Sequence, residues 1–181
     1  MSQPSNTENS RVILAEGKHL RLVREGHWEY AERTKATSAV VIVAVTDDRR
    51  LLLAEQYRIP VGKRVIELPA GLVGDIEGQQ TDDLETAARR ELLEETGYEA
   101  ESVHVMAMGP PTSGLATELV AMVVARGLKQ VAAGGGVESE QIEVHAIGLD
   151  RVAKWLQEQA SRDVLIDPKV YAGLYFAEHE A

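Results

Sequence analysis

The chain has 181 residues, a length that one domain with a small appendage accounts for. Apolar residues make up 44% and charged residues 27%, as in ordinary globular proteins. The absence of cysteine excludes disulfides, thiolate zinc sites and cysteine nucleophiles. The 29 acidic residues outnumber the 19 basic ones and give a net charge of −10, which disfavours nucleic acid as a partner.

The chain lacks the signatures of a membrane or exported protein. No apolar run approaches the roughly 20 residues that span a bilayer. The first ten residues, MSQPSNTENS, are polar and contain no apolar signal core. We therefore expect a disordered tail over 1–10 on a cytoplasmic protein without a membrane partner.

The N-terminal half predicts mainly strands. Alternating apolar residues with turn glycines predict a small antiparallel sheet over 12–31. The β-branched run at 38–45 predicts a strand buried on both faces, and a second strand follows at 51–58. A polar, glycine-containing loop is predicted over 71–83.

A helix is predicted over 84–96, begun by a capping box of Asp82 with Glu85 and ended by Gly97. A flexible glycine loop is predicted at 132–136. Further strands are predicted at 102–108, 119–125 and 142–147, and helices at 150–160 and 167–178. Strands interleaved with helices indicate an α/β (α+β) layered domain.

Three carboxylates gather on this helix. Glu91, Glu94 and Glu95 fall within an arc of about 100°, which small apolar residues of the helix share. Acids at a helix C-terminus oppose the macrodipole and repel one another, so a divalent cation would stabilise the cluster. Oxygen ligands suit Mg²⁺ or Mn²⁺. The alternative is a surface helix end on which Arg90 pairs with Glu94.

The segment 90–98, RELLEETGY, resembles the second half of the Nudix box, in which Arg-Glu and Glu-Glu precede a glycine and a hydrophobic residue. The first half departs from the pattern. Gly71 and Glu77 keep the usual spacing, but twelve residues separate Glu77 from Arg90, which makes the loop longer than usual. The departure leaves the role of Glu77 open and does not affect the acidic helix.

Two other stretches resemble the nucleotide-sugar branch of that family. The segment 67–71, ELPAG, implies the Ala70 carbonyl as a metal ligand and Glu67 as a substrate contact. The segment 55–58, EQYR, implies that Arg58 reaches the substrate phosphates. The resemblance covers most of the chain and implies a Nudix fold, a mixed sheet sandwiched between helices.

The resemblance also implies a homodimer that exchanges N-terminal segments. On this reading, residues 11–37 form a β segment for dimerisation and for the substrate pocket, and residues 38–181 form the hydrolase domain. Trp28 would stack on the base, and core packing is the alternative for this side chain. Arg33 is a candidate phosphate contact, since guanidinium groups match phosphate geometry, although a surface ion pair is the alternative.

The segment 110–118 resembles the specificity loop that follows the box, so Ser113, Gly114 and Glu118 are candidate substrate contacts. In the ADP-ribose subgroup a proline often stands at the position of Ser113. This departure leaves room for other nucleotide sugars.

The loop after Gly136 carries acids at alternating positions. In the branch that the chain resembles, this loop supplies the base that activates water or a further metal ligand. Glu140 and Glu138 are therefore candidate bases, with a plain acidic surface loop as the alternative. Glu94 remains a candidate for metal ligand or base.

The sequence thus predicts Mg²⁺- or Mn²⁺-dependent hydrolysis of nucleoside diphosphate sugars, such as ADP-ribose, to a nucleoside monophosphate and a sugar phosphate. Two alternatives stay open. One is a housecleaning pyrophosphatase for nucleoside triphosphates, and the other is a non-catalytic Nudix-like sensor of nucleotide sugars.

Overall fold

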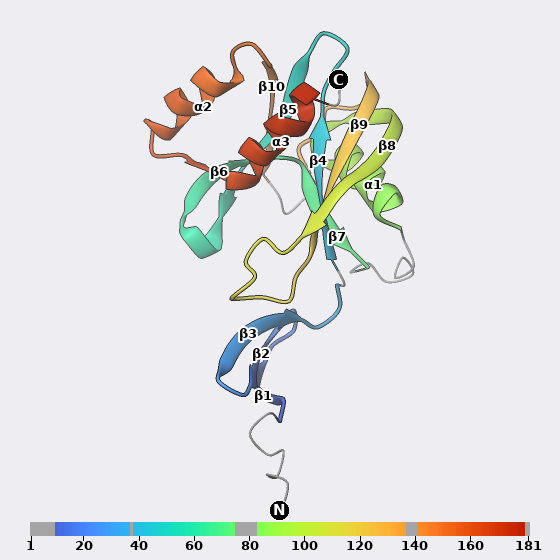
Figure 1. Ribbon diagram of the computed structural model, residues 1–181. Coiled ribbons are helices and arrows are strands. Elements are labelled where there is room, and N and C mark those ends of the chain that lie inside the picture. The colour runs from blue at the N-terminus through green and yellow to red at the C-terminus, as the bar shows by residue number, and fades with distance from the viewer. Residues whose placement is uncertain (1–9, 37, 75–82, 137–140, 180–181) are drawn as a thin grey trace, which may run out of the picture.

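The computed structural model describes residues 10–36, 38–74, 83–136 and 141–179. Its N-terminal sheet contains the antiparallel strands β1 (Val12–Glu16), β2 (Leu20–Glu25) and β3 (Trp28–Arg33). Gly26 turns the chain between β2 and β3 with a positive φ of 58°, which suits glycine. In Figure 1 this sheet projects from the main body of the molecule.

The first sheet of the main body has the order β7–β4–β9–β8. Its strands are β4 (Ser38–Ala44), β7 (Ala70–Val73), β8 (Tyr98–Gly109) and β9 (Val120–Gln130). β4 runs parallel to β9 and antiparallel to β7. The β-branched run of the sequence is the centre of this sheet, and all residues from Val40 to Ala44 are buried, as predicted for a strand covered on both faces.

The second sheet has the order β10–β5–β6–β11. Its strands are β5 (Arg50–Arg58), β6 (Lys63–Glu67), β10 (Glu143–Gly148) and β11 (Leu165–Ile166). A 3₁₀ turn at Ile59–Val61 joins β5 to β6. The sequence did not predict β6 and β11 as strands.

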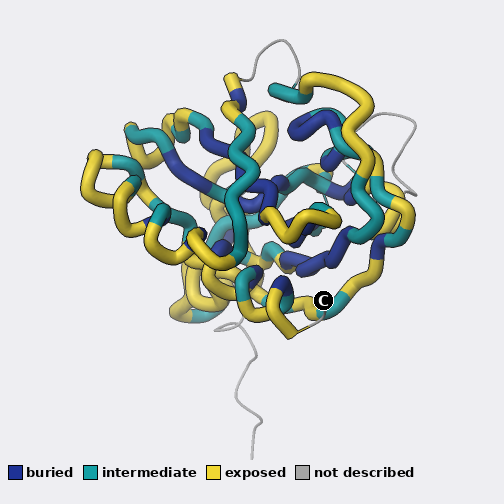
Figure 2. The backbone as a smooth tube through the Cα atoms, turned by 90° about the horizontal axis from the view of Figure 1, so that it is seen from above, coloured by how far each residue is buried: buried dark blue, intermediate teal, exposed yellow. Residues whose placement is uncertain are grey.

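Helices cover the sheets from two sides: α1 (Leu84–Thr96), α2 (Val152–Ala160) and α3 (Pro168–His179). One buried cluster joins β4 and β9 to α1, and another joins the sheets to α2 and α3. The buried segments gather in the interior of the body in Figure 2. This arrangement confirms the predicted mixed α/β fold, with sheets between helices. None of the described helices is long and apolar enough to cross a membrane.

Two local predictions were wrong. The helix cap is Asp83 rather than Asp82, since the Asp83 side chain accepts the Thr86 N–H at 2.7 Å. The stretch predicted as loop from Gly71 begins as β7, because Ala70–Val73 pairs with β4 and buries Val73. Residues 75–82, including Glu77, lie outside the described residues.

Candidate active site

A cavity of about 600 Å³ brings together residues from both sheets, α1, α3 and the loop before β9. We call it the central cavity. Seven of the predicted site residues line it: Arg33, Arg58, Glu67, Ala70, Glu91, Glu95 and Glu118. The cavity therefore unites residues that are widely separated along the chain.

Helix α1 places Glu91 and Glu95 in this cavity. The helix begins at the Asp83 cap and ends at Gly97, whose φ of 77° and N–H bond to Leu93 terminate it. Only 5% of Glu95 and 13% of the Glu91 side chain are exposed, so both acids belong to the inner face of the helix. The Glu94 side chain is 39% exposed and is not among the described residues that line the cavity.

Strand β7 lies directly against these acids. The Ala70 N–H donates to Oε2 of Glu95 at 3.0 Å. A Cβ atom on Gly71 would stand only 1.9 Å from Cδ of Glu91, so a larger residue at this position would displace this carboxylate. Two carboxylates beside a backbone carbonyl form a set of hard oxygen donors, which fits a divalent cation such as Mg²⁺ or Mn²⁺.

Arg90 orients the acids rather than lining the cavity. Its guanidinium donates to Oε1 of Glu91 at 2.7 Å, lies 3.6 Å from Oε2 of Glu94 and reaches the Leu72 carbonyl at 3.4 Å. We refer to Glu91, Glu94 and Glu95 as the α1 carboxylates. Arg90 meets Glu91 and Glu94, and its single positive charge does not balance three carboxylates, which favours a bound cation.

Two acid-held arginines line another part of the cavity. Arg58 on β5 donates to Oε2 of Glu67 on β6 at 2.7 Å. Arg33 at the end of β3 donates to Glu118 in the loop before β9. Each carboxylate fixes the direction of a guanidinium group. Glu67 and Glu118 were predicted as substrate contacts; in the structure both line the cavity and each accepts a hydrogen bond from one of these arginines.

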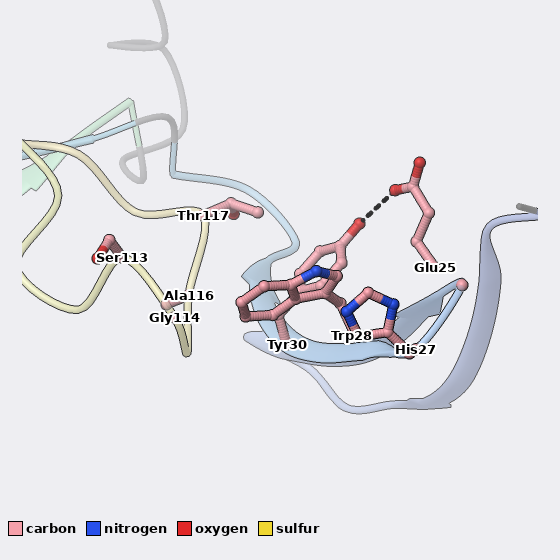
Figure 3. A pocket seen from close by; sticks show the side chains of 9 residues that line it. Glu25, His27, Trp28, Tyr30, Ser113, Gly114, Ala116 and Thr117 are labelled. Atoms are coloured by element: carbon pink, nitrogen blue, oxygen red, sulfur yellow. Dashed lines mark hydrogen bonds between the residues drawn. The ribbon is translucent and has the colours of Figure 1, made fainter.

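A second cavity of about 660 Å³ collects the predicted residues Trp28, Ser113 and Gly114. We call it the aromatic cavity. In Figure 3 Trp28 lies with Tyr30 and His27 on the β2–β3 hairpin, opposite the loop that carries Ser113 and Gly114. The Trp28 residue is 54% exposed, so core packing does not explain it.

The aromatic cavity is held together by backbone hydrogen bonds. The Ala31 N–H donates to the Leu115 carbonyl at 2.8 Å, and the Thr117 N–H donates to the Ala31 carbonyl at 3.1 Å. A Cβ atom on Gly114 would lie 4.0 Å from Cζ3 of Trp28, which places this glycine at the edge of the indole ring. The bonds fix the predicted specificity loop to the N-terminal sheet.

The predicted bases Glu138 and Glu140 lie outside the described residues. The chain on either side of them is described. The N–H groups of Gly135 and Gly136 donate to the carbonyls of Glu95 and Glu94 at 2.8 and 3.1 Å, and the Ile142 N–H donates to the Gly135 carbonyl at 3.3 Å. The described residues on both sides of the predicted bases are therefore connected to the end of α1.

The sequence reasoning missed Gln56, Thr112 and Lys169, which also line the central cavity. A signal for Gln56 existed, because it is two residues before Arg58 and strand alternation puts both on one face. No local signal distinguishes Lys169, which stands at the start of α3.

Another group of charged residues lies on the opposite face of β5. We call Glu55, Arg64, Glu143 and His145 the Glu55 cluster. Ligand atoms of its two acids and its histidine lie within 4.8 Å of one another, a spacing that could hold a metal ion. Arg64 donates to Glu55 and lies 3.7 Å from Glu143, so a cationic side chain already offsets part of the negative charge of this group.

Comparisons with known proteins place this geometry in a family. The family model described as NUDIX domain matches residues 35–167. The chain is 32% identical over 139 residues to the methanol dehydrogenase activator of Bacillus methanolicus, covering 76% of this chain and 72% of that protein. It is 30% identical over 151 residues to the ADP-ribose pyrophosphatase of Bacillus subtilis (strain 168), covering 83% of this chain and 77% of that one.

The same comparison extends to solved structures. The crystal structure of an ADP compounds hydrolase aligns with 94% of this chain and 90% of its own, at a TM-score of 0.70 and 20% sequence identity. At this identity the likeness concerns the fold alone, and it agrees with the sheets between helices described above.

Proposed function

Because the chain belongs to the Nudix family, we propose that it hydrolyses the diphosphate bond of nucleoside diphosphate sugars, ADP-ribose or a related compound, to a nucleoside monophosphate and a sugar phosphate. One observation carries the proposal. The central cavity combines two inward-facing carboxylates beside a backbone carbonyl with two arginines that are each held by an acid. This combination suits a substrate with a diphosphate at its centre.

The two cavities suggest where each part of such a substrate binds. The diphosphate would lie in the central cavity, where Arg33 and Arg58 bind its oxygens through charge-assisted hydrogen bonds. The base would stack on Trp28 in the aromatic cavity, beside Ser113 and Gly114. Trp28 and Arg33 are the first and last residues of β3, so one strand would carry both a base contact and a phosphate contact.

Glu91, Glu95 and the Ala70 carbonyl would hold the divalent cation. When bound, Mg²⁺ or Mn²⁺ supplies positive charge that stabilises the phosphate oxygens in the transition state. The residues of the chain do the rest. Arg33 and Arg58 hold the diphosphate for in-line attack by water, and a carboxylate accepts the proton of that water as the anhydride P–O bond breaks.

Glu140 or Glu138 is the proposed proton acceptor, and Glu94 is the remaining candidate. A carboxylate bound to metal is a poor base, because the cation favours its ionised form. A separate acid on the loop after Gly136 avoids this problem. The hydrogen bonds from Gly135 and Gly136 to the end of α1 support this proposal, because they hold the residues just before the candidate bases next to the proposed metal ligands.

The proposed enzyme is a cytoplasmic homodimer that exchanges its N-terminal segments, with no nucleic-acid or membrane partner. Apolar side chains exposed on the projecting sheet support the dimer: Val12, Ile13, Leu14, Leu20 and Leu22. Only Val23 of this sheet is buried, so the sheet lacks a core of its own. A partner subunit would cover this surface. Sedimentation that shows the full-length chain to be a monomer would overturn this assembly.

A substrate panel tests the proposed reaction. The full chain is assayed with ADP-ribose, other nucleoside diphosphate sugars and nucleoside triphosphates, with Mg²⁺, Mn²⁺ or a chelator, and released monophosphate is measured. Cleavage of nucleotide sugars that stops with chelator is expected. A preference for triphosphates supports the housecleaning alternative, and tight binding without turnover supports a sensor. Full activity in metal-stripped protein contradicts the proposed chemistry.

A further inference from the structure

Lys169 is a cation of the central cavity that has no role in the reaction as described so far. Three cationic residues occur among the described residues that line this cavity: Arg33, Arg58 and Lys169. The Lys169 side chain is 35% exposed, so it is partly buried at the cavity edge and still open to a ligand.

The packing of α3 holds Lys169 at this edge. Gly173 is one turn after Lys169, so the two positions share a face of the helix. A Cβ atom on Gly173 would lie 2.6 Å from Cδ1 of Leu68 and 3.3 Å from Cγ2 of Val43. Leu68 itself lines the central cavity. The close approach at Gly173 therefore seats the first turn of α3 against the cavity wall.

The position of Lys169 in α3 is unfavourable for the helix alone. Lys169 lies in the first turn, where the macrodipole repels a positive charge. Asp167 offsets this cost, since its Oδ2 is 2.5 Å from Nζ of Lys169 and its Oδ1 accepts the Lys169 N–H at 2.7 Å. The acid therefore holds the ammonium group in a defined place, as Glu67 holds Arg58.

We propose that Lys169 binds a diphosphate oxygen of the substrate in the central cavity, as a third cation beside Arg33 and Arg58. Asp167 acts as its positioning residue. The assignment rests on the proposed function for the identity of the substrate. Its physical basis is the cavity itself, where an anion bound at Lys169 also gains the favourable field of the helix N-terminus.

The test measures binding of inorganic diphosphate with Mg²⁺ to the full-length protein by calorimetry. Lys169→Met keeps the apolar stem and removes the charge, so the affinity should fall by about 10- to 100-fold. Lys169→Arg keeps the charge and should restore most of the affinity. Lys154→Met on α2 is the matched control, because Lys154 is 83% exposed and pairs only with its helix neighbour Glu158 among described residues.

The outcomes separate this inference from the proposed function. Unchanged diphosphate affinity in folded Lys169→Met, with a lowered melting temperature, means that Lys169 only stabilises α3 and overturns the inference. Absence of diphosphate binding in the wild type overturns it as well. Wild-type binding that Lys169→Met weakens, without hydrolysis of any nucleotide sugar, supports Lys169 and defeats the proposed reaction. Lys169→Gln replaces the methionine variant if that variant does not fold.

Discussion

Two groups of acids in the described part of the chain have different surroundings. Of the α1 carboxylates, Glu91 and Glu95 line the central cavity, Glu91 and Glu94 meet Arg90, and Glu95 accepts a backbone N–H from β7. In the Glu55 cluster, two acids meet both Arg64 and His145 on the other face of β5. Close carboxylates therefore do not by themselves identify a metal site. The side chains that the fold places beside the carboxylates determine whether the group favours a metal ion.

The contacts of the Glu55 cluster are those of an ion pair that stabilises the fold. Burial by itself raises the pKa of the Glu55 carboxyl, but hydrogen bonds from Arg64 and His145 outweigh burial and hold this pKa below its ordinary value. His145 also packs against Trp155 of α2, with ring centroids 5.0 Å apart. The cluster thus ties β5, β6 and β10 to α2.

The largest expected effect is on catalysis. Glu91→Gln and Glu95→Gln should each lower kcat by about 10³-fold, because a bound divalent cation contributes several kcal/mol of transition-state stabilisation. Turnover of a nucleotide sugar is the measurement. Glu55→Gln is the matched control and should stay within a few-fold of the wild type.

Metal binding, measured by thermal unfolding, tests whether the cation binds at the α1 carboxylates or at the Glu55 cluster. Saturating Mn²⁺ should raise the melting temperature of the wild type and of Glu55→Gln, since a ligand at about 100 times its Kd adds about 2.7 kcal/mol. Glu91→Gln and Glu95→Gln should lose this shift. The reverse pattern, in which only Glu55→Gln loses it, would place the cation at the Glu55 cluster.

The next effect concerns the loop anchored on α1. Glu140→Gln keeps shape and hydrogen-bonding capacity but removes the base, so kcat should fall by about 10²-fold while substrate affinity changes little. Glu138→Gln is the paired control. If both variants and their combination turn over within a few-fold of the wild type, the base is elsewhere and Glu94 is tested next.

A smaller effect is expected on stability. Arg64→Met leaves Glu55 buried without its guanidinium, and unfolding by urea should show a loss of about 1–2 kcal/mol. This value is discounted because the Arg64 side chain is 38% exposed. Combining Arg64→Met with Glu55→Gln should recover part of the loss. Strict additivity of the two changes would show that they do not interact.

The smallest effect is on the pH dependence of stability. Because the folded state lowers the pKa of Glu55 from about 4.5, its contribution is complete above that pH and is lost as the pH falls through the lowered value. Glu55→Gln should therefore flatten the acid side of the stability curve and leave the neutral region similar in shape. Identical acid slopes for the two proteins would remove Glu55 from this account.

The sequence by itself determined those helices and strands whose residue patterns are local, such as an apolar run or a terminal glycine. The bounds of α1 were predicted correctly because an amphipathic run ends at a glycine, and β4 was predicted because its apolar run is continuous. The convergence of Glu91 and Glu95 followed from helical spacing alone.

Tertiary structure decided what has no local signal. Residues 70–73 form a strand only because β4 offers them partners, and short strands depend on such pairing more than on propensity. The pair Arg33–Glu118 joins residues that the chain separates widely. Lys169 reaches the central cavity because α3 packs at Gly173 against Leu68, a contact that no helical or strand period encodes. Helical spacing brings the carboxylates of α1 together, whereas only long-range packing places Arg64 of β6 and His145 of β10 beside Glu55 of β5.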